Sequence, residues 1–222
     1  MNAYARRLLP TVALASAFAL QATAQTIALP APRRTGGMPL REALAVRATA
    51  RDFAPTPLSA QEISDLLWAA WGFNRPGKRT APTAMNRQEI TLYAYTDEGV
   101  FRYEPGPDEN RLVCLTREDK RASAGFQQPF IATAPLILVY VVDMNKMRVR
   151  DDPAAAARFA AVDCGFVGQN VYLHAASEGL HTCFIGRVDA ELVGPVLGLT
   201  ESQIPLFAQV VGHPAASAEA KE

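Results

Sequence analysis

The chain has 222 residues, of which 49% are hydrophobic and 20% are charged, a composition that suits one folded domain with a sizeable core. Lysine plus arginine equals aspartate plus glutamate at 22 each, so no basic excess indicates nucleic acid as a partner and no acidic tract indicates a charged tail. Three histidines and three cysteines lie far apart without metal-ligand spacing, which argues against a metal site and against a disulfide framework.

Residues 1–24 have the pattern of a secretory signal peptide. Arg6-Arg7 forms a positive start, residues 8–20 form a short apolar run, and Ala22-Thr23-Ala24 is a small-residue cleavage site. We therefore expect cleavage before Gln25 and a periplasmic location. An uncleaved anchor is the alternative, although the apolar run is short for a membrane span. The arginine pair leaves the twin-arginine and general secretory routes both open.

The first part of the mature chain contains two predicted helices. Residues 25–38 are rich in proline, arginine and glycine and predict an extended N-terminal arm. Residues 39–46 predict a short helix with proline in its first turn. Ser59-Ala60-Gln61-Glu62 is a capping box that opens a helix over residues 59–73. A loop rich in proline, threonine and arginine follows over residues 75–88.

The second part alternates predicted strands and helices. The apolar run over residues 135–142 predicts a central strand buried on both faces. The helix over 154–178 is apolar around much of its girth, which indicates burial in the domain centre or in a subunit interface. The other expected elements are a half-buried strand over 89–96, a turn at 97–99, a returning strand over 100–103, a helix within 117–127, strands over 182–185 and 205–211, and a helix over 189–197.

These interleaved elements predict one α+β domain with three layers over residues 39–214, followed by a polar tail at 215–222 that frays. Within it, Arg47-Ala48-Thr49-Ala50-Arg51 places a hydroxyl between two guanidinium groups. A planar guanidinium matches the oxygens of a phosphate, so this spacing predicts a phosphate site. The alternative is a solvated helix end.

Several further motifs follow in order between about residue 38 and residue 214. They include Arg47-x-Thr49-x-Arg51-x-Phe53, Leu66-Leu67-Trp68-Ala69-Ala70-x-Gly72, Arg79-Thr80-Ala81-Pro82-Thr83-Ala84-x-Asn86, Gly99-x-Phe101-Arg102-Tyr103, Gln128-x-Phe130, Asp163-x-Gly165, Ile185-Gly186 and Val211-Gly212-His213-Pro214. In these motifs the chain resembles the FMN-dependent nitroreductase family, and within it the azoline-dehydrogenase-like branch. The resemblance implies a homodimer with a mostly antiparallel central sheet flanked by helices, the long helix at the interface, and FMN in two interfacial sites.

The resemblance also implies roles for individual residues. Arg47, Thr49 and Arg51 would bind the FMN phosphate and the neighbouring ribityl oxygens, with Thr49 standing where the family usually has serine. A backbone N–H at Ile185 and Gly186 would meet flavin N5, and Gln128 would reach the pyrimidine edge. The loop of the partner subunit beside the flavin ring would contain Pro82, Thr83, Ala84 and Asn86. The plain alternatives are surface positions for Thr49 and Gln128, turn capping by Asn86, and a simple core strand for 182–185.

The chain departs from the family pattern in two places. Many relatives have a basic residue beyond the last strand, whereas only Lys221 follows it here, so either Arg47 and Arg51 suffice or Arg79 or Arg187 compensates. Arg87-Gln88-Glu89 stands where the azoline branch would have a Tyr-Pro-like pair. No catalytic residue is assigned; His181 is a candidate proton donor or a plain loop histidine.

The resulting expectation is an exported FMN-dependent oxidoreductase that acts on a small organic substrate by two-electron ping-pong chemistry, with NAD(P)H or another electron donor. Two alternatives remain. One is a flavin-fold protein that binds a small molecule without redox turnover, and the other is an azoline-type dehydrogenase or oxidase that passes electrons to oxygen or a quinone.

Overall fold

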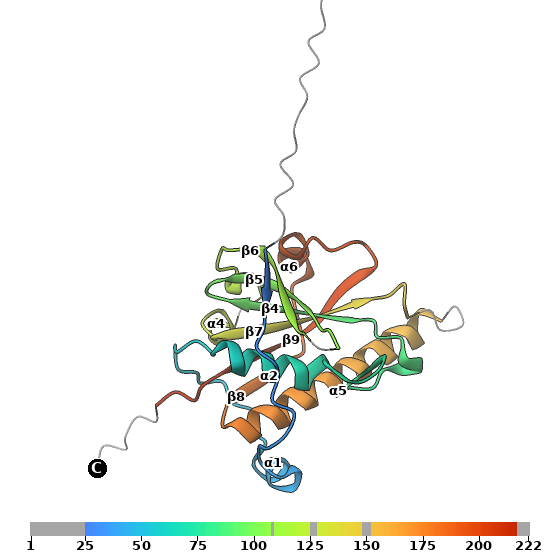
Figure 1. Cartoon of the computed structure of the whole chain (residues 1–222). Coiled ribbons are helices and arrows are strands. Elements are labelled where there is room, and N and C mark those ends of the chain that lie inside the picture. Colours follow the sequence, from blue (N-terminus) through green and yellow to red (C-terminus); the bar gives the residue numbers. More distant parts are fainter. Residues whose placement is uncertain (1–24, 108, 125–127, 148–151, 217–222) are drawn as a thin grey trace, which may run out of the picture.

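The computed structural model describes residues 25–107, 109–124, 128–147 and 152–216. Its centre is a seven-stranded sheet in the order β1-β6-β5-β4-β7-β9-β8, in which neighbouring strands run antiparallel (Figure 1). The strands are β1 (Thr26–Ala28), β4 (Ile90–Thr96), β5 (Gly99–Glu104), β6 (Arg111–Thr116), β7 (Leu136–Asp143), β8 (His181–Ile185) and β9 (Gln203–Gly212). A separate small hairpin joins β2 (Phe73–Arg75) and β3 (Lys78–Arg79).

Helices cover both faces of this sheet (Figure 1). The longer helices α2 and α5 pack on one face, and α3, α4 and α6 pack on the other. The helices are α1 (Leu40–Val46), α2 (Ala60–Trp71), the 3-10 turn η1 (Ala84–Asn86), α3 (Arg121–Ala124), α4 (Pro129–Ala132), α5 (Pro153–Glu178) and α6 (Ala190–Leu197). The three-layer α+β architecture expected from the sequence is therefore confirmed.

Strand β7 holds the two helical layers together. Leu138 and Tyr140 point into the core beneath α2 and α5, whereas Val139 and Val141 point into the core beneath α6. Side chains alternate across a strand, so a strand covered on both faces needs an almost continuous apolar run. The prediction of a central strand is confirmed. The same reasoning corrects the half-buried strand expected over 89–96, because the strand β4 that forms there is mostly buried on both faces.

The expected helix ends are formed by local side chains. The backbone N–H of Glu62 donates to Ser59 Oγ at 3.2 Å, and the Glu62 carboxylate accepts from the Ser59 N–H at 2.7 Å, which is a capping box. Helix α5 begins after Asp152, whose carboxylate accepts from the Ala155 N–H. It ends at Gly179, whose φ of 69° is left-handed and suits glycine.

Several segments differ from the sequence expectation. The arm over 25–38 begins with β1, which adds an edge strand to the sheet through β6, a strand the sequence analysis did not predict. The helix expected within 117–127 is reduced to the four residues of α3, and 125–127 lie outside the described residues. The loop expected over 75–88 contains the β2–β3 hairpin and η1.

Other sequence expectations fall outside the described residues or concern small details. The predicted signal peptide at 1–24 and most of the tail, residues 217–222, are not described. None of the helices described is long and apolar enough to cross a membrane. Cys114, Cys164 and Cys183 are free thiols, two of them buried.

Candidate functional site

Residues 47–53, here called the arginine segment, leave helix α1 and run along the open edge of β8. They are not helical, so Arg47, Thr49 and Arg51 stand beyond the helix end rather than on it. The Ala50 N–H donates to the Thr182 carbonyl at 3.0 Å, and Phe53 forms a bridge with Pro214. Arg47 and Thr49 both contact Tyr172 on helix α5, and Arg51, two residues further along the segment, is exposed.

Tyr172 on helix α5 connects the arginine segment to β8. Its hydroxyl lies 2.9 Å from Thr49 Oγ1 and accepts the backbone N–H of Phe184 at 2.9 Å. The Arg47 guanidinium lies 5.3 Å from the centre of the Tyr172 ring, within the range of a cation–π contact. Sequence reasoning missed Tyr172. The only available signal was a polar-tipped aromatic residue in a helix that is apolar around much of its girth.

The end of β8 presents backbone groups toward the arginine segment. On the outer edge of β8, the Thr182 carbonyl accepts the Ala50 N–H and the Phe184 N–H donates to the Tyr172 hydroxyl. The chain bends at Gly186, directly after the end of β8 and two residues after Phe184. Ile185 is buried and pairs with Ala208, so its side chain belongs to the core while Gly186 is exposed.

Residues 82–88, here called the left-handed loop, contain three non-glycine residues with positive φ. These are Met85, Asn86 and Gln88, with φ of 54°, 53° and 50°, a conformation that non-glycine residues rarely adopt. The loop is held by its own hydrogen bonds. Thr83 Oγ1 accepts the backbone N–H of Gln88 at 3.1 Å, and Asn86 Oδ1 accepts from the side-chain amide of Gln88 at 3.3 Å. The exposed Asn86 therefore takes part in the turn, and its exposure leaves it open to a ligand.

Two carboxyl groups lie beneath this loop. Asp163 on α5 accepts the Ala84 N–H at 2.8 Å, and Asp163 and Glu89 are both buried. Burial is the main cause that raises the pKa of Glu89 to about 7; the neighbouring Asp163 also raises this pKa, whereas a backbone hydrogen bond and Lys146 lower it. The left-handed loop therefore lies over a buried carboxyl, Glu89, whose pKa is near neutral.

The other predicted residues occupy separate places. Gln128 caps α4 through its carbonyl, which accepts the Ile131 N–H. Arg79 is stacked 3.9 Å from the Phe73 ring centre, donates to Gln88 Oε1 at 2.9 Å, and burial lowers its pKa to about 10. Arg79 is thus engaged in supporting the left-handed loop. His181 contacts the Asp52 carbonyl at 2.9 Å, which favours a structural role.

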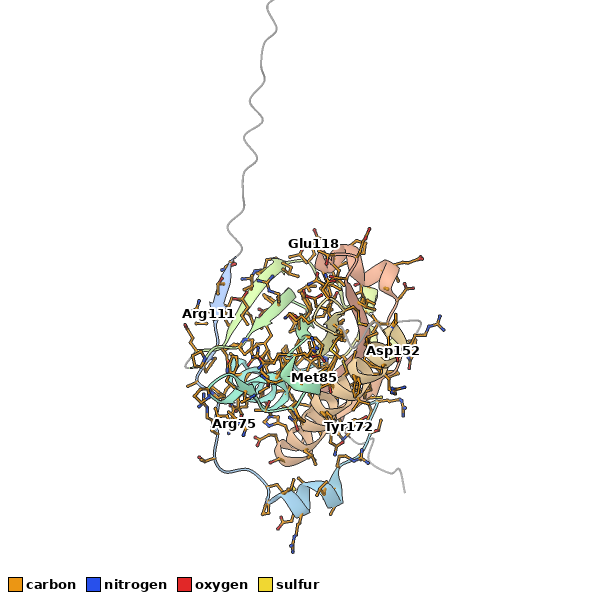
Figure 2. The ribbon with its side chains drawn as sticks, turned by 90° about the vertical axis from the view of Figure 1, so that its right-hand side faces the viewer. Arg75, Met85, Arg111, Glu118, Asp152 and Tyr172 are labelled. Atoms are coloured by element: carbon orange, nitrogen blue, oxygen red, sulfur yellow. The ribbon has the colours of Figure 1, made fainter. Side chains whose placement is uncertain are left out.

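The arginine segment and the left-handed loop do not meet within one chain. Figure 2 labels Met85 in the loop and Tyr172 toward the end of α5. Asp163, which holds the loop, precedes Tyr172 by nine residues on α5, which corresponds to about two and a half turns and about 14 Å. The two side chains therefore leave opposite sides of the helix. Within one chain the two regions therefore lie on different sides of α5.

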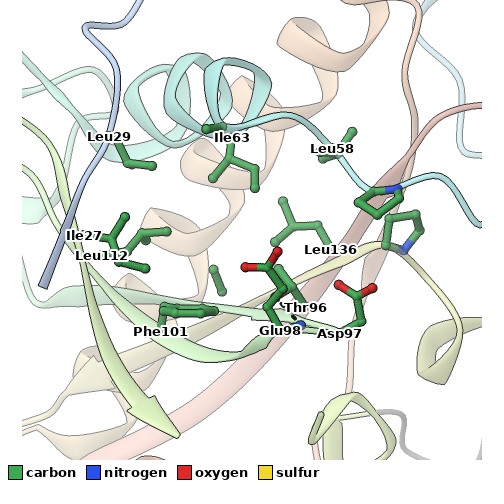
Figure 3. Close-up of a pocket in the computed structure, with 14 residues that line it drawn as sticks. Ile27, Leu29, Leu58, Ile63, Thr96, Asp97, Glu98, Phe101, Leu112 and Leu136 are labelled. Atoms are coloured by element: carbon green, nitrogen blue, oxygen red, sulfur yellow. Dashed lines mark hydrogen bonds between the residues drawn. The ribbon is translucent and has the colours of Figure 1, made fainter. Parts of the chain in front are cut away.

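An apolar pocket of about 180 Å³ lies elsewhere, between α2 and the sheet (Figure 3). Leu58, Ile63 and Leu136 line it, and the turn that contains Asp97 and Glu98 borders one end. It shares no residue with the arginine segment or the left-handed loop. The pocket is therefore distinct from the candidate site.

The structure is a three-layer α+β domain with a candidate anion site beside an open sheet edge, and comparisons with known proteins identify its family. The model of the nitroreductase family matches residues 44–213, so the chain belongs to the nitroreductase family. A Methanocaldococcus jannaschii protein that carries the name nitroreductase is 30% identical over 185 residues, which cover 78% of this chain and 90% of that protein.

A solved structure and a second relative extend this result. The crystal structure of a Ralstonia eutropha protein, also named as a nitroreductase, is 35% identical with a TM-score of 0.79, covering 86% of this chain and 90% of that one. The NADPH-flavin oxidoreductase of Vibrio harveyi is 32% identical over 120 residues, half of each chain. The nitroreductase-like fold is confirmed, and the family and its relatives support an oxidoreductase with a flavin-dependent redox role.

Proposed function

We propose that this protein is an exported FMN-dependent oxidoreductase that processes a small organic substrate by two-electron ping-pong chemistry. The observation that carries the proposal is that Arg47 and Thr49 both contact Tyr172 next to the open edge of β8, with the exposed Arg51 two residues further along the segment. Bound FMN would supply the redox chemistry, taking up electrons from a donor and passing them to the substrate. The chain's own residues would bind and orient it.

The arginine segment fits the phosphate end of FMN. Arg47 and Arg51 would donate charge-assisted hydrogen bonds to the phosphate oxygens, and the Thr49 hydroxyl would add a neutral donor. With Arg79 engaged in the left-handed loop, we propose that Arg47 and Arg51 suffice without a basic residue directly after β9.

The end of β8 fits the ring of the flavin. Gly186 is exposed just beyond the end of β8, two residues after the Phe184 N–H that bonds to Tyr172, which supports the proposal that the Ile185–Gly186 backbone donates to flavin N5. A donor at that atom is one way in which a protein tunes flavin electronics. Gln128 is proposed to reach the pyrimidine edge.

Two copies of the chain are needed to assemble the proposed site. Pro82, Thr83, Ala84 and Asn86 of one chain would lie beside a ring whose phosphate is held by the other. Three large apolar residues on α5 support an interface between the two regions: Phe159, Val162 and Phe166 are 38%, 47% and 44% exposed. Apolar side chains gathered on one exposed stripe are typical of an interaction surface. We propose a homodimer with two FMN sites.

The electron donor and the cellular location are also part of the proposal. The name of the Vibrio harveyi relative includes NADPH, which supports NAD(P)H as the donor. The leader at 1–24 supports export to the periplasm, where a different donor would be needed. Azoline-type dehydrogenation is the second candidate. Gln88, at the position of the expected Tyr-Pro-like pair, is hydrogen-bonded to Thr83 and Asn86 of the left-handed loop and to the Gly77 carbonyl, which disfavours that candidate.

The experiment that tests the proposal is an absorption spectrum of purified residues 25–222, followed by identification of the chromophore released on heating. We expect a flavin spectrum and about one FMN per chain, which dithionite bleaches and an acceptor restores. A colourless protein that refuses added FMN would overturn the proposal. A bound flavin that does not cycle would favour a binding protein without redox turnover.

A further inference from the structure

The contacts of Tyr172 give it a role that extends beyond the predicted cofactor residues. We propose that Tyr172 is a positioning residue for the FMN phosphate, because its hydroxyl orients Thr49 and its ring orients Arg47. This inference rests on the proposed function, because it requires that the arginine segment binds the phosphate.

The hydrogen bonds around the Tyr172 hydroxyl have a preferred direction. The Phe184 N–H donates to this oxygen at 2.9 Å, so the hydroxyl keeps its single hydrogen for another acceptor. Thr49 Oγ1 is the neighbouring atom, also at 2.9 Å. When Tyr172 donates to Thr49, the hydrogen of Thr49 is released for a ligand. Phosphate oxygens are strong acceptors, so a bound phosphate selects this direction along the relay.

The ring of Tyr172 acts on Arg47 in a different way. The guanidinium lies 5.3 Å from the ring centre, and a cation over an aromatic face is attracted by the ring's electron density. This contact restricts the rotamers of a long side chain before the ligand arrives, so less freedom is lost on binding. Replacement by phenylalanine removes the hydroxyl relay and keeps the ring, whereas replacement by leucine removes both.

Tyr172 also fixes the distance between the two ends of the proposed cofactor site. Its hydroxyl holds the Phe184 N–H, two residues before the Gly186 N–H proposed for flavin N5. One side chain on the rigid helix α5 therefore sets the position of β8 relative to Thr49. Preorganisation of this kind increases affinity by reducing the cost of ordering the site.

The test compares FMN with riboflavin, which has the same ring and lacks the phosphate. Dissociation constants are measured by flavin fluorescence on flavin-free protein. Loss of one neutral hydrogen bond corresponds to roughly a 2- to 10-fold weakening. We expect Tyr172→Phe to weaken FMN by about that factor and riboflavin by less than about 2-fold. Tyr172→Leu weakens FMN further. Tyr103→Phe, which removes a hydroxyl bonded to Asn110 at 2.9 Å, is the matched control and changes neither constant.

A double variant and a flavin-free measurement separate the possible outcomes. Thr49→Val and Tyr172→Phe disrupt one relay, so the double variant should bind FMN about as well as the weaker single variant. In flavin-free protein, Tyr172→Phe should speed amide exchange at Phe184. Equal weakening of FMN and riboflavin, or fully additive single effects, would overturn the positioning role. Wild-type protein that binds riboflavin as tightly as FMN would instead overturn the phosphate site of the proposed function, and this inference with it.

Discussion

The arginine segment and the left-handed loop are built by opposite physical means. The arginine segment lies along the free edge of β8 and is held by neutral hydrogen bonds, including those of Ala50 to Thr182 and of Thr49 to Tyr172. The left-handed loop has three non-glycine residues in the left-handed region. It rests on Asp163, whose neighbour Glu89 is a buried carboxyl.

The two regions therefore also differ in where their charged groups lie. Charge faces outward in the arginine segment, where Arg47 and Arg51 meet solvent or an anion. Charge faces inward beneath the left-handed loop, where burial holds the pKa of Glu89 at about 7. The arginine segment is held by neutral hydrogen bonds, whereas the left-handed loop contains strained backbone and lies over a carboxyl whose pKa is near neutral.

The largest expected effect comes from removing both guanidinium groups of the arginine segment. Each charge-assisted hydrogen bond contributes about 1.5–3 kcal/mol, so Arg47→Ala with Arg51→Ala should weaken FMN at least about 100-fold. The measurement is the FMN content of the purified double variant and its FMN dissociation constant.

A surface arginine provides the control for that variant. Arg111 lies on β6 and is paired with Glu109 at the protein surface, so Arg111→Ala should retain FMN. Unchanged FMN content in the double variant would contradict the phosphate assignment. Loss of FMN in the Arg111 control would indicate that the measurement reports general instability.

The second prediction concerns how the two regions come together. Val162 lies on the exposed stripe of α5 and is 47% exposed. Val162→Glu places a charge in the proposed interface, where burial without a partner is unfavourable. We expect a dimer for the wild type and a monomer for the variant by light scattering at micromolar concentration, with loss of bound FMN.

Leu192 offers a matched control for the interface. It is 53% exposed on α6, which covers the sheet face opposite to α5, so Leu192→Glu should remain dimeric and retain FMN. A wild-type monomer that binds FMN fully would disprove the shared site, because the arginine segment and the left-handed loop are on opposite sides of α5 within one chain.

The sequence predicted the parts of this molecule that depend on local rules. The capping box at Ser59 and Glu62 and the left-handed Gly179 are formed by residues close in the chain. The apolar run that forms β7 predicted a central strand, because burial on both faces imposes a continuous apolar pattern. The side chains of Arg47 and Arg51 were identified as candidates from their spacing alone.

The missed features depend on contacts between distant residues. Strand β6 is stabilised by pairing with β5 and β1, and no short pattern specifies such partners. Tyr172 contacts Thr49 across 123 residues. In the sequence, Glu89 is an acidic residue just before a predicted strand core. Its burial is set by α5 and the left-handed loop, which pack around it. A single sequence contains no local sign of these contacts.

The smallest of the expected effects concerns the buried carboxyl pair. The pKa of Glu89 is raised in the fold from 4.5 to about 7, so the folded state retains a proton that the unfolded chain releases. This contribution to stability is complete below pH 4.5 and is lost as pH rises to about 7 and above. The difference between these values corresponds to about 3 kcal/mol.

Substitution of Glu89 isolates this effect from the other titrating groups. Glu89→Gln keeps the shape of the neutral acid and removes its titration, so denaturant unfolding should show similar stabilities at pH 5 and a more stable variant at pH 8. The exposed Glu104→Gln should follow the wild type at both pH values. Because Asp163 accepts the Ala84 N–H, amide exchange at Ala84 should respond to pH in the wild type, and exchange at Phe184 should not once the intrinsic pH dependence is removed. Equal pH responses at both amides would mean that the two regions open with the same pH dependence. That result would contradict the distinction between them.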